Sequence, residues 1–256
     1  MSIRFASLGS GSEGNALVVQ IGSSVVMMDC GFGLAATEQR LARAGLTAAA
    51  IDAVVVTHEH SDHIGGVAKF AKKHRIPVWL THGTAKLLDQ SLFPEELINF
   101  VDPHATFSVG DVEVIPYLVP HDAFEPVQYV FSDGAARLGV LTDTGSITAH
   151  IRHTLSGCDA LVLECNHDLD MLMQGSYPAS LKKRVAGKFG HLDNLTAASL
   201  LREIDCSRLK HVVAAHLSQR NNTQALATSA LAGALGCAQS WVGIAEQVGG
   251  FDWREV

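Results

Sequence analysis

The sequence lacks an apolar run long enough to cross a membrane and a cysteine pattern that would build a disulfide framework. A transmembrane helix needs about 20 consecutive apolar residues, and the 256-residue chain has no such run. Its five cysteines are odd in number and widely spaced, without a C-x-x-C pair, so we expect reduced thiols. The first residues also lack the charged and then apolar segments of a secretory signal. We therefore expect a cytoplasmic protein without membrane contact.

Charged residues are also scarce, and their balance is acidic. Lys and Arg number 19 against 26 Asp and Glu, which gives a net charge of −7 at pH 7 with neutral histidines. This balance argues against a protein that coats nucleic acid non-specifically, because that binding mode needs a basic surface. Hydrophobic residues reach 47% of the chain and indicate a large globular core.

Hydrophobic patterning predicts strands followed by helices in each half of the chain. Residues 34–44 are typical of an amphipathic helix, a further helix is expected near residues 84–90, and the last strand is expected at residues 241–244. No linker or low-complexity segment separates the halves. We therefore expect a single domain over residues 1–256, with two facing sheets and helices outside them.

The densest group of potential metal ligands directly follows an apolar run that predicts a buried strand. Residues 57–63 contain the pattern His-x-His-x-Asp-His. At a strand end the backbone leaves regular structure, so His58 and His60 can converge on one ion while Asp62 and His63 reach a second. Imidazole and carboxylate groups are ligands of zinc, manganese and iron. The pattern therefore predicts a metal site.

Three later polar residues also end predicted strands, and they complete a set of seven ligands. Two ions about 3.5 to 4 Å apart lower the pKa of a shared water and favour hydrolysis. We therefore expect a catalytic role for Asp62 in addition to ligation. The expected assignment is His58, His60 and His121 on one ion, Asp62, His63 and His216 on the other, and Asp143 as a bridge.

Other polar residues are candidates for contacts around the metals. His191 precedes a predicted helix, where it can donate to a developing oxyanion or protonate a leaving oxygen. His167 follows a predicted strand and could support the ligands through hydrogen bonds. Lys182 and Lys183 belong to a basic group before His191 that either faces solvent or contacts a polyanionic substrate.

A glycine-rich stretch at residues 9–14 fits the G-x-G-x-x-G pattern of dinucleotide-binding proteins. In those proteins the pattern opens a helix whose N-terminus binds the pyrophosphate. Here residues 15–21 are rich in β-branched side chains and typical of a strand, and Asn15 stands where a P-loop has lysine. We therefore expect no nucleotide cofactor and interpret the stretch as a turn close to the metal site.

Several segments together resemble the metallo-β-lactamase superfamily, and within it the YycJ-like (WalJ) branch, along nearly the whole chain. Besides the His-x-His-x-Asp-His pattern, the resemblance lies in residues 8–15, 142–145, 164–168, 190–194 and 215–218, with Asn221 and Asn222.

The resemblance implies an α/β protein with an αββα sandwich, in which two mixed sheets carry one or two metal ions at their edge. It implies the same seven ligands for two divalent ions, zinc in the first place and manganese or iron as alternatives. The implied activity is a metal-dependent 5′ exonuclease, a phosphodiesterase acting on DNA. Around His191 we expect Asn194 to contact the substrate and Asp193 to support the site.

Three features distinguish the sequence from other members of the superfamily. The short segment between His121 and Asp143 leaves no room for the RNA-binding arm of tRNA-processing relatives. His60 stands where flavo-diiron relatives carry Glu, which disfavours a redox function. Asp193 stands where many members of the YycJ-like branch have Ser, so the hydrogen bonding around His191 is expected to differ.

Two other functions fit the same residues. A small-molecule hydrolase acting on a thioester, lactone or cyclic nucleotide would use the same metal centre, and the acidic net charge favours it slightly. Such an enzyme needs a narrow, enclosed pocket, whereas a nuclease needs an open groove. A non-catalytic metal-dependent sensor or binding module would hold its metal without an open coordination position.

Overall fold

The computed structural model describes residues 2–88 and 93–256, and its strands form two sheets of seven. In the first sheet the strand order is β14-β1-β2-β3-β4-β5-β6, parallel from β3 to β6 and antiparallel elsewhere. Its strands are β1 (Ile3–Gly9), β2 (Ala16–Ile21), β3 (Ser24–Met28), β4 (Ala53–Val55), β5 (Val78–Thr81), β6 (Ile98–Val101) and β14 (Phe251–Glu255).

The second sheet has the order β13-β12-β11-β10-β9-β8-β7, parallel from β10 to β13 and antiparallel from β7 to β10. Each sheet is therefore mixed, with a parallel half. Its strands are β7 (Phe107–Val109), β8 (Val112–Leu118), β9 (Val127–Ser132), β10 (Arg137–Leu141), β11 (Ala160–Glu164), β12 (His211–Ala215) and β13 (Gly243–Ile244).

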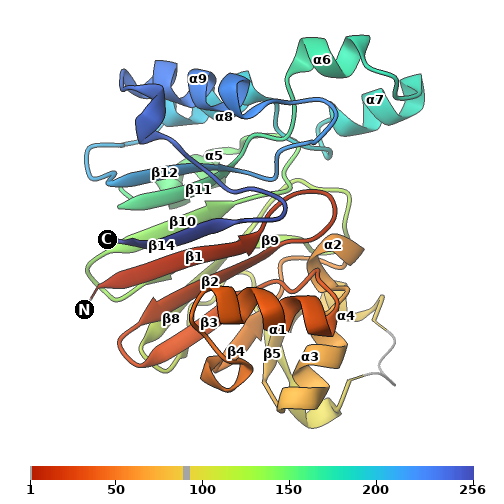
Figure 1. Cartoon of the computed structure of the whole chain (residues 1–256), viewed down its shortest axis with the longest axis vertical. Helices are drawn as coiled ribbons and strands as arrows, with labels where there is room; N and C mark the ends of the chain where they lie inside the picture. The colour runs from red at the N-terminus through yellow and green to blue at the C-terminus, as the bar shows by residue number, and fades with distance from the viewer. Residues whose placement is uncertain (1, 89–92) are drawn as a thin grey trace.

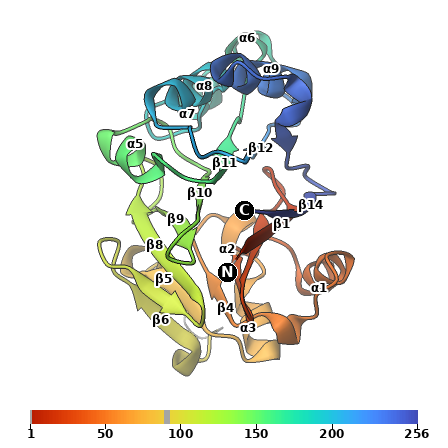
Figure 2. The ribbon, with the colours of Figure 1, turned by 90° about the vertical axis from the view of Figure 1, so that its left-hand side faces the viewer.

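Helices cover the outer face of each sheet, so the chain forms four layers (Figure 1 and Figure 2). Helices α1 and α3 pack on the first sheet, and α5, α8 and α9 pack on the second. Helices α6 and α7 project at one end of the second sheet, at the upper right of Figure 1. The bounds are α1 (Leu34–Arg43), α2 (Ser61–Ile64), α3 (Val67–His74), α4 (His82–Ala85), α5 (Ala149–Leu155), α6 (Leu169–Gln174), α7 (Ala179–Val185), α8 (Asn194–Glu203) and α9 (Gln224–Leu235).

Three apolar clusters hold the layers together, and strand alternation explains them. Val18 and Val19 of β2 are both fully buried, yet their side chains point to opposite faces of the sheet. Val19 joins Phe5 and Tyr129 in the core between the sheets, whereas Val18 joins Phe70 beneath the outer helices. Strands buried on both faces need continuous apolar runs, and this accounts for the high hydrophobic content.

The parallel halves of the two sheets determine where polar loops meet. The carboxyl ends of parallel strands lie at one edge of a sheet, and ligands bind outside that edge. Asp29 and His58 follow β3 and β4, whereas Asp143 and His216 follow β10 and β12. The four-layer arrangement confirms the expected αββα sandwich and brings these loops to one place.

The structure differs from the expected elements at several positions. Strands β6 and β14 and helix α6 were not expected, and the last expected strand is shorter because Gln239–Trp241 forms a 3-10 helix. Of the helix expected near residues 84–90, only residues 84 and 85 lie in a helix, α4, and residues 86–88 form a turn. Residues 89 and 90 of that prediction lie outside the described residues. Within the described part of the chain, every helix is too short or too polar to cross a membrane.

Candidate metal centre

His58, His60 and His121 form the first group of converging ligand atoms. Each offers a ring nitrogen, and these nitrogens lie within 4.8 Å of one another. His121 Nδ1 donates to the Gly190 carbonyl at 3.0 Å, which leaves Nε2 as a lone-pair donor. That Nε2 lies 3.2 Å from His60 Nδ1. The buried Nε2 of His58 has no hydrogen-bond partner among the described residues, as expected of an atom that binds an ion.

Asp62, His63 and His216 form the second group, also within 4.8 Å. Asp62 Oδ2 lies 3.4 Å from His63 Nε2 and 3.5 Å from His216 Nε2. His63 Nδ1 lies 2.8 Å from Asp29 Oδ2, so its proton is held there and Nε2 is free for a metal. A carboxylate behind a histidine in this way is common at metal sites. Asp29 is buried, and it was not among the residues expected at the site.

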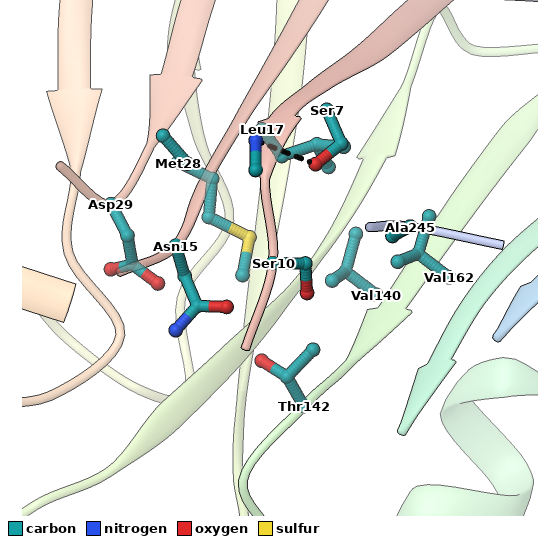
Figure 3. A pocket seen from close by; sticks show the side chains of 12 residues that line it. Ser7, Ser10, Asn15, Leu17, Met28, Asp29, Val140, Thr142, Val162 and Ala245 are labelled. Atoms are coloured by element: carbon teal, nitrogen blue, oxygen red, sulfur yellow. Dashed lines mark hydrogen bonds between the residues drawn. The ribbon is translucent and has the colours of Figure 1, made fainter. Parts of the chain in front are cut away.

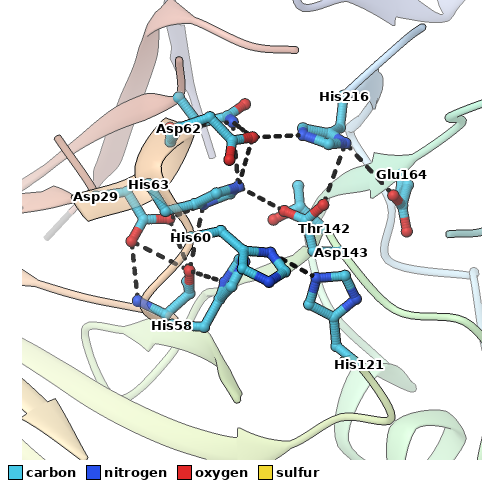
Figure 4. Close-up of polar contacts among 12 residues, drawn as sticks. Asp29, His58, His60, Asp62, His63, His121, Thr142, Asp143, Glu164 and His216 are labelled. Atoms are coloured by element: carbon cyan, nitrogen blue, oxygen red, sulfur yellow. Dashed lines mark hydrogen bonds and ion pairs between the residues drawn. The ribbon is translucent and has the colours of Figure 1, made fainter. Parts of the chain in front are cut away.

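Asp143 lies between the two groups (Figure 4). Its Oδ2 is 2.7 Å from His63 Nε2, and its Oδ1 is 3.2 Å from His216 Nδ1. Oδ2 accepts no hydrogen bond from the described part of the chain, and Asp143 also converges with His58 and His63. All seven expected ligands thus lie together, and Asp143 contacts His63 and His216 of the second group and converges with His58 of the first.

The backbone of three site residues is held in the left-handed region. Asp29, Asp143 and His216 have φ angles of 61°, 49° and 54°. Such angles cost about 1 to 3 kcal/mol for a non-glycine residue and persist where the surroundings enforce them. Asp29 and His216 directly follow β3 and β12, and Asp143 stands two residues after the end of β10. The strain therefore turns the side chain from the sheet toward the centre.

The carboxylates and imidazoles of the site shift one another's pKa values. Burial raises the pKa of Asp143, but His216 and His63 lower it well below its usual range. Burial lowers the pKa of His63, but Asp143 and Asp29 hold it well above its usual value. Burial also lowers the pKa of His216, but Asp143 raises it to about 9. The buried anions therefore require positive charge, which a divalent cation would supply in place of protons.

His191 lies beside this centre and is oriented by a buried carboxylate. Its Nδ1 is 2.8 Å from Glu164 Oε1 and 3.1 Å from Asp143 Oδ1. Burial lowers the pKa of His191, but Glu164 and Asp143 raise it to about 10. Glu164 is fully buried and also accepts from the backbone amides of Thr144 and Leu192. Glu164 was not expected at the site, although it ends a predicted strand as Asp143 does.

Three other expected contacts are placed differently. Asn194 is buried, and its side-chain amide exchanges two hydrogen bonds of 2.9 Å with Asn222, so in this structure it contacts Asn222 and not the metal centre. Asp193 caps α8 by accepting from the backbone amides of Leu195 and Thr196, and its backbone pairs with that of His167. His167 Nδ1 lies 3.3 Å from Asn166 Oδ1, and Asn166 Nδ2 lies 3.3 Å from His216 Nδ1.

The basic group on α7 borders the site at one point. Arg184 Nε donates to Asp122 Oδ2 at 2.6 Å, and Asp122 Oδ1 lies 3.5 Å from His121 Nε2. Lys182 donates to a backbone carbonyl of α6, and Lys183 is exposed. None of the seven residues of α7 is buried, so the helix presents its charges to solvent beside the metal centre.

The glycine-rich turn lies against the metal centre, as expected. Asn15 Nδ2 is 3.1 Å from His63 Nε2, and the Asn15 amide donates to the Asp62 carbonyl at 2.8 Å. Ser10 Oγ accepts from the His216 amide at 2.9 Å. The turn therefore fixes two ligand-bearing loops.

Two cavities near the centre differ in size and access. A cavity of about 30 Å³ has room for water only. Its lining side chains, which include Ser10, Asn15 and Thr142, are drawn in Figure 3. A depression of about 650 Å³ begins at His60 and opens to solvent. Phe124 on its wall is accordingly 64% exposed. The lining residues of the depression are Glu59, His60, Ser61, Leu87, Asp122, Ala123 and Phe124.

Comparison with known proteins places these features in a family context. The sequence model of the beta-lactamase superfamily domain matches residues 25–236. Exodeoxyribonuclease YycJ of Bacillus anthracis is 37% identical over 235 residues, which cover 89% of this chain and 87% of that protein. Exodeoxyribonuclease WalJ of Streptococcus pneumoniae is 29% identical over 248 residues, covering 95% and 92%.

Solved structures with little sequence identity share the fold. The metallo-beta-lactamase fold protein YhfI from Bacillus subtilis superposes with a TM-score of 0.75 at 16% identity, covering 98% of this chain and 99% of that one. A diphosphatase from the PhnP family gives 0.70 at 18% identity, covering 100% and 98%. Both likenesses concern the arrangement of sheets and helices.

Proposed function

Because this chain belongs to the metallo-β-lactamase superfamily, we propose that it is a metal-dependent nuclease that removes nucleotides from the 5′ end of DNA. The observation that carries the proposal is its similarity to an exodeoxyribonuclease along 89% of its length. The convergence of all expected ligand residues agrees with this assignment. We also propose that residues 1–256 form one domain, because strand β14 at the end of the chain pairs with β1.

The site fits a pair of divalent ions. The unpartnered Nε2 of His58 and the excess of buried carboxylate support metal binding. When bound, two such ions would acidify water and neutralise the charge of a phosphodiester. Zinc suits these nitrogen and oxygen ligands, and manganese or iron are alternatives. The proposed ligands are His58, His60 and His121 for one ion, Asp62, His63 and His216 for the other, and Asp143 between them.

Two residues of the chain would act on protons during cleavage. His191 holds Nδ1 against Glu164 and Asp143, so Nε2 remains to donate to a phosphate or leaving oxygen. The raised pKa of His191 keeps that proton in place at neutral pH. Asp62 is 22% exposed, and at this edge it would orient the attacking water as well as bind metal.

The surroundings favour the end of a polymer as substrate. The depression at His60 opens to solvent, and the cavity of about 30 Å³ is too small for a thioester or lactone substrate. Arg184 brings the basic helix α7 to the rim, where Lys182 and Lys183 would contact phosphates. A local basic surface is compatible with the acidic net charge, because only this rim would meet DNA.

The proposal is tested by DNA cleavage with defined metal content. We would strip the protein of metal, resupply zinc or manganese separately, and add duplex DNA with a labelled 5′ phosphate. The Asp62→Asn variant is the control, because it keeps the shape of the side chain and removes its charge.

Stepwise release of 5′ nucleotides by the wild type, absent in the variant, is the expected result. Release of label by Asp62→Asn at the wild-type rate would contradict the site assignment. Cleavage of a thioester or cyclic nucleotide, with DNA and RNA ends left intact, would keep the metal centre and reject the nuclease.

A further inference from the structure

Two exposed phenylalanine side chains lie beside the metal centre. Phe124 is 64% exposed and Phe189 is 62% exposed. Phe124 closely follows the ligand His121, and Phe189 closely precedes His191. Aromatic rings exposed beside a positively charged groove are a common means of binding unpaired bases by stacking.

Backbone contacts hold the two segments in place. The Phe124 amide donates to Glu59 Oε1 at 2.8 Å, which ties its loop to the loop between His58 and His60. The Asp122 amide donates to the Phe189 carbonyl at 3.0 Å. A Cβ on Gly145 would lie 2.5 Å from the Phe189 nitrogen, so glycine allows this segment to rest on the turn after β10. Both rings are therefore carried by fixed backbone.

The charges around the two rings differ. Phe124 lines the depression together with Glu59 and Asp122, of which Asp122 is paired with Arg184, so the depression favours an uncharged base over a further phosphate. Phe189 follows the basic residues of the segment 182–188. A DNA strand would therefore place its terminal base in the depression and its phosphate backbone over α7.

We propose that Phe124 and Phe189 are stacking platforms for two unpaired nucleobases at the DNA end, the terminal base on Phe124 and the next base on Phe189. This inference rests on the proposed nuclease function and specifies its substrate. Bases held separately on rings from two different loops would leave the base stack of the duplex. Stacking on an aromatic ring tolerates any base, because every base has a π-face. The substrate is therefore an end with unpaired first bases, without sequence preference.

Abasic nucleotides test each platform separately. The substrates are DNA with a 5′ overhang, unmodified or with a tetrahydrofuran abasic nucleotide at the first or second position. Phe124→Ala is expected to lower kcat/KM on unmodified DNA about 10- to 100-fold, the range that base stacking supplies. It causes no further loss on DNA that is abasic at the first position, and Phe189→Ala behaves in the same way at the second position.

Matched variants separate stacking from damage to the fold. Phe124→Trp keeps an aromatic face and retains activity. Leu226→Ala removes an exposed side chain from α9, on the outer layer, and leaves kcat/KM unchanged. Metal content is measured for every variant and equals that of the wild type.

Two results would overturn the inference. One is an equal loss for Phe124→Ala on normal and abasic DNA, and the other is wild-type cleavage of blunt duplex as fast as overhang DNA. If the wild type cleaves no DNA at all, the proposed function itself fails together with the inference. Wild-type cleavage without the position-specific pattern rejects the stacking platforms alone.

Discussion

In three of the site histidines, a contact of one ring nitrogen leaves the other ring nitrogen available to bind a metal ion. His121 donates through Nδ1 to a carbonyl, His63 faces Asp29 through Nδ1, and His58 Nδ1 lies 2.9 Å from the Thr57 hydroxyl. In each ring Nε2 is then the atom available to a metal. These hydrogen bonds fix the ring orientation, and they would fix the tautomer once a metal ion replaces the proton on Nε2.

Replacement of Asp29 tests this orienting role. Asn keeps the size of the side chain and tolerates the positive φ of 61°, but it removes the charge that holds His63. We expect Asp29→Asn to lower metal affinity about 10- to 100-fold with little loss of fold, measured by competition with a chelator. Asp52→Asn is the control, because Asp52 accepts from the Val25 amide at the opposite end of β4. Unchanged metal affinity in Asp29→Asn would contradict the role.

Glu164→Gln tests whether the carboxylate positions and charges His191. Glutamine can still accept from the Thr144 amide but loses the charge that raises the pKa of His191. A general acid is active only while it is protonated, at a pH below its pKa. A lower pKa of His191 therefore lowers the pH above which activity is lost. We expect kcat to fall about 100-fold, with metal content retained and the alkaline limb of the pH–rate profile displaced to lower pH. A profile with an unmoved alkaline limb would reject this role.

Much of the candidate site could be predicted from residue type and spacing. The dense histidine motif and the polar residues after apolar runs, such as Asp143 and His216, indicate metal ligands directly. Asp29 also ends an apolar run, but its contact with His63 depends on the packing of β3 against β4, which local sequence does not specify. Asn194 fits a motif, yet only the fold reveals that Asn222 occupies its amide.

At the level of elements, the strands with both faces buried were easiest to predict. Central strands such as β2 and β11 are almost entirely apolar, with Gln20 and the terminal Glu164 as their polar residues. Strands β6 and β14 occupy the two edges of the first sheet and are only partly buried, so their composition gives a weak signal. Helix α6 has Leu172 as its buried residue, which is too little for a clear amphipathic period.

Helix α7 is predicted to bind the phosphate backbone of DNA. Replacement of Lys182 and Lys183 by Ala should weaken DNA binding and flatten its salt dependence, because each lost phosphate contact lowers the slope of log K against log salt by about 0.7 to 0.9. Binding is measured at several salt concentrations in the Asp62→Asn background, which leaves the DNA intact. Lys210→Ala is the matched control, since Lys210 is exposed before β12, at the edge opposite the metal centre. If the slope of log K against log salt is equal in the Asp62→Asn protein, in its Lys182/Lys183 variant and in its Lys210→Ala variant, α7 lies outside the DNA interface.

At the scale of the whole molecule, metal binding and folding are coupled. The ligands come from both sheets, so bound ions would join the two halves of the chain. An ion at 100 times its dissociation constant stabilises the folded state by about 2.7 kcal/mol. For a chain of this size two ions should raise Tm by about 10 °C or more. Calorimetry should record one cooperative transition, displaced downward by a chelator.

The Asp143→Ala variant provides the comparison for this shift. Without the Asp143 carboxylate, His63 and His216 lose a contact and His58 loses a converging ligand atom, so the variant should show a much smaller increase of Tm with metal. Two separate transitions in the wild type would contradict the single domain. A Tm that does not respond to metal would contradict the proposed centre.

The most direct test of the account is the rate of 5′ nucleotide release measured against the number of metal ions bound per chain. We predict that the wild-type rate rises with added metal and reaches its plateau at two ions per chain, whereas Asp143→Ala stays inactive at every metal level. Full activity in the metal-free protein, or wild-type activity in Asp143→Ala, would show that DNA cleavage does not take place at this centre.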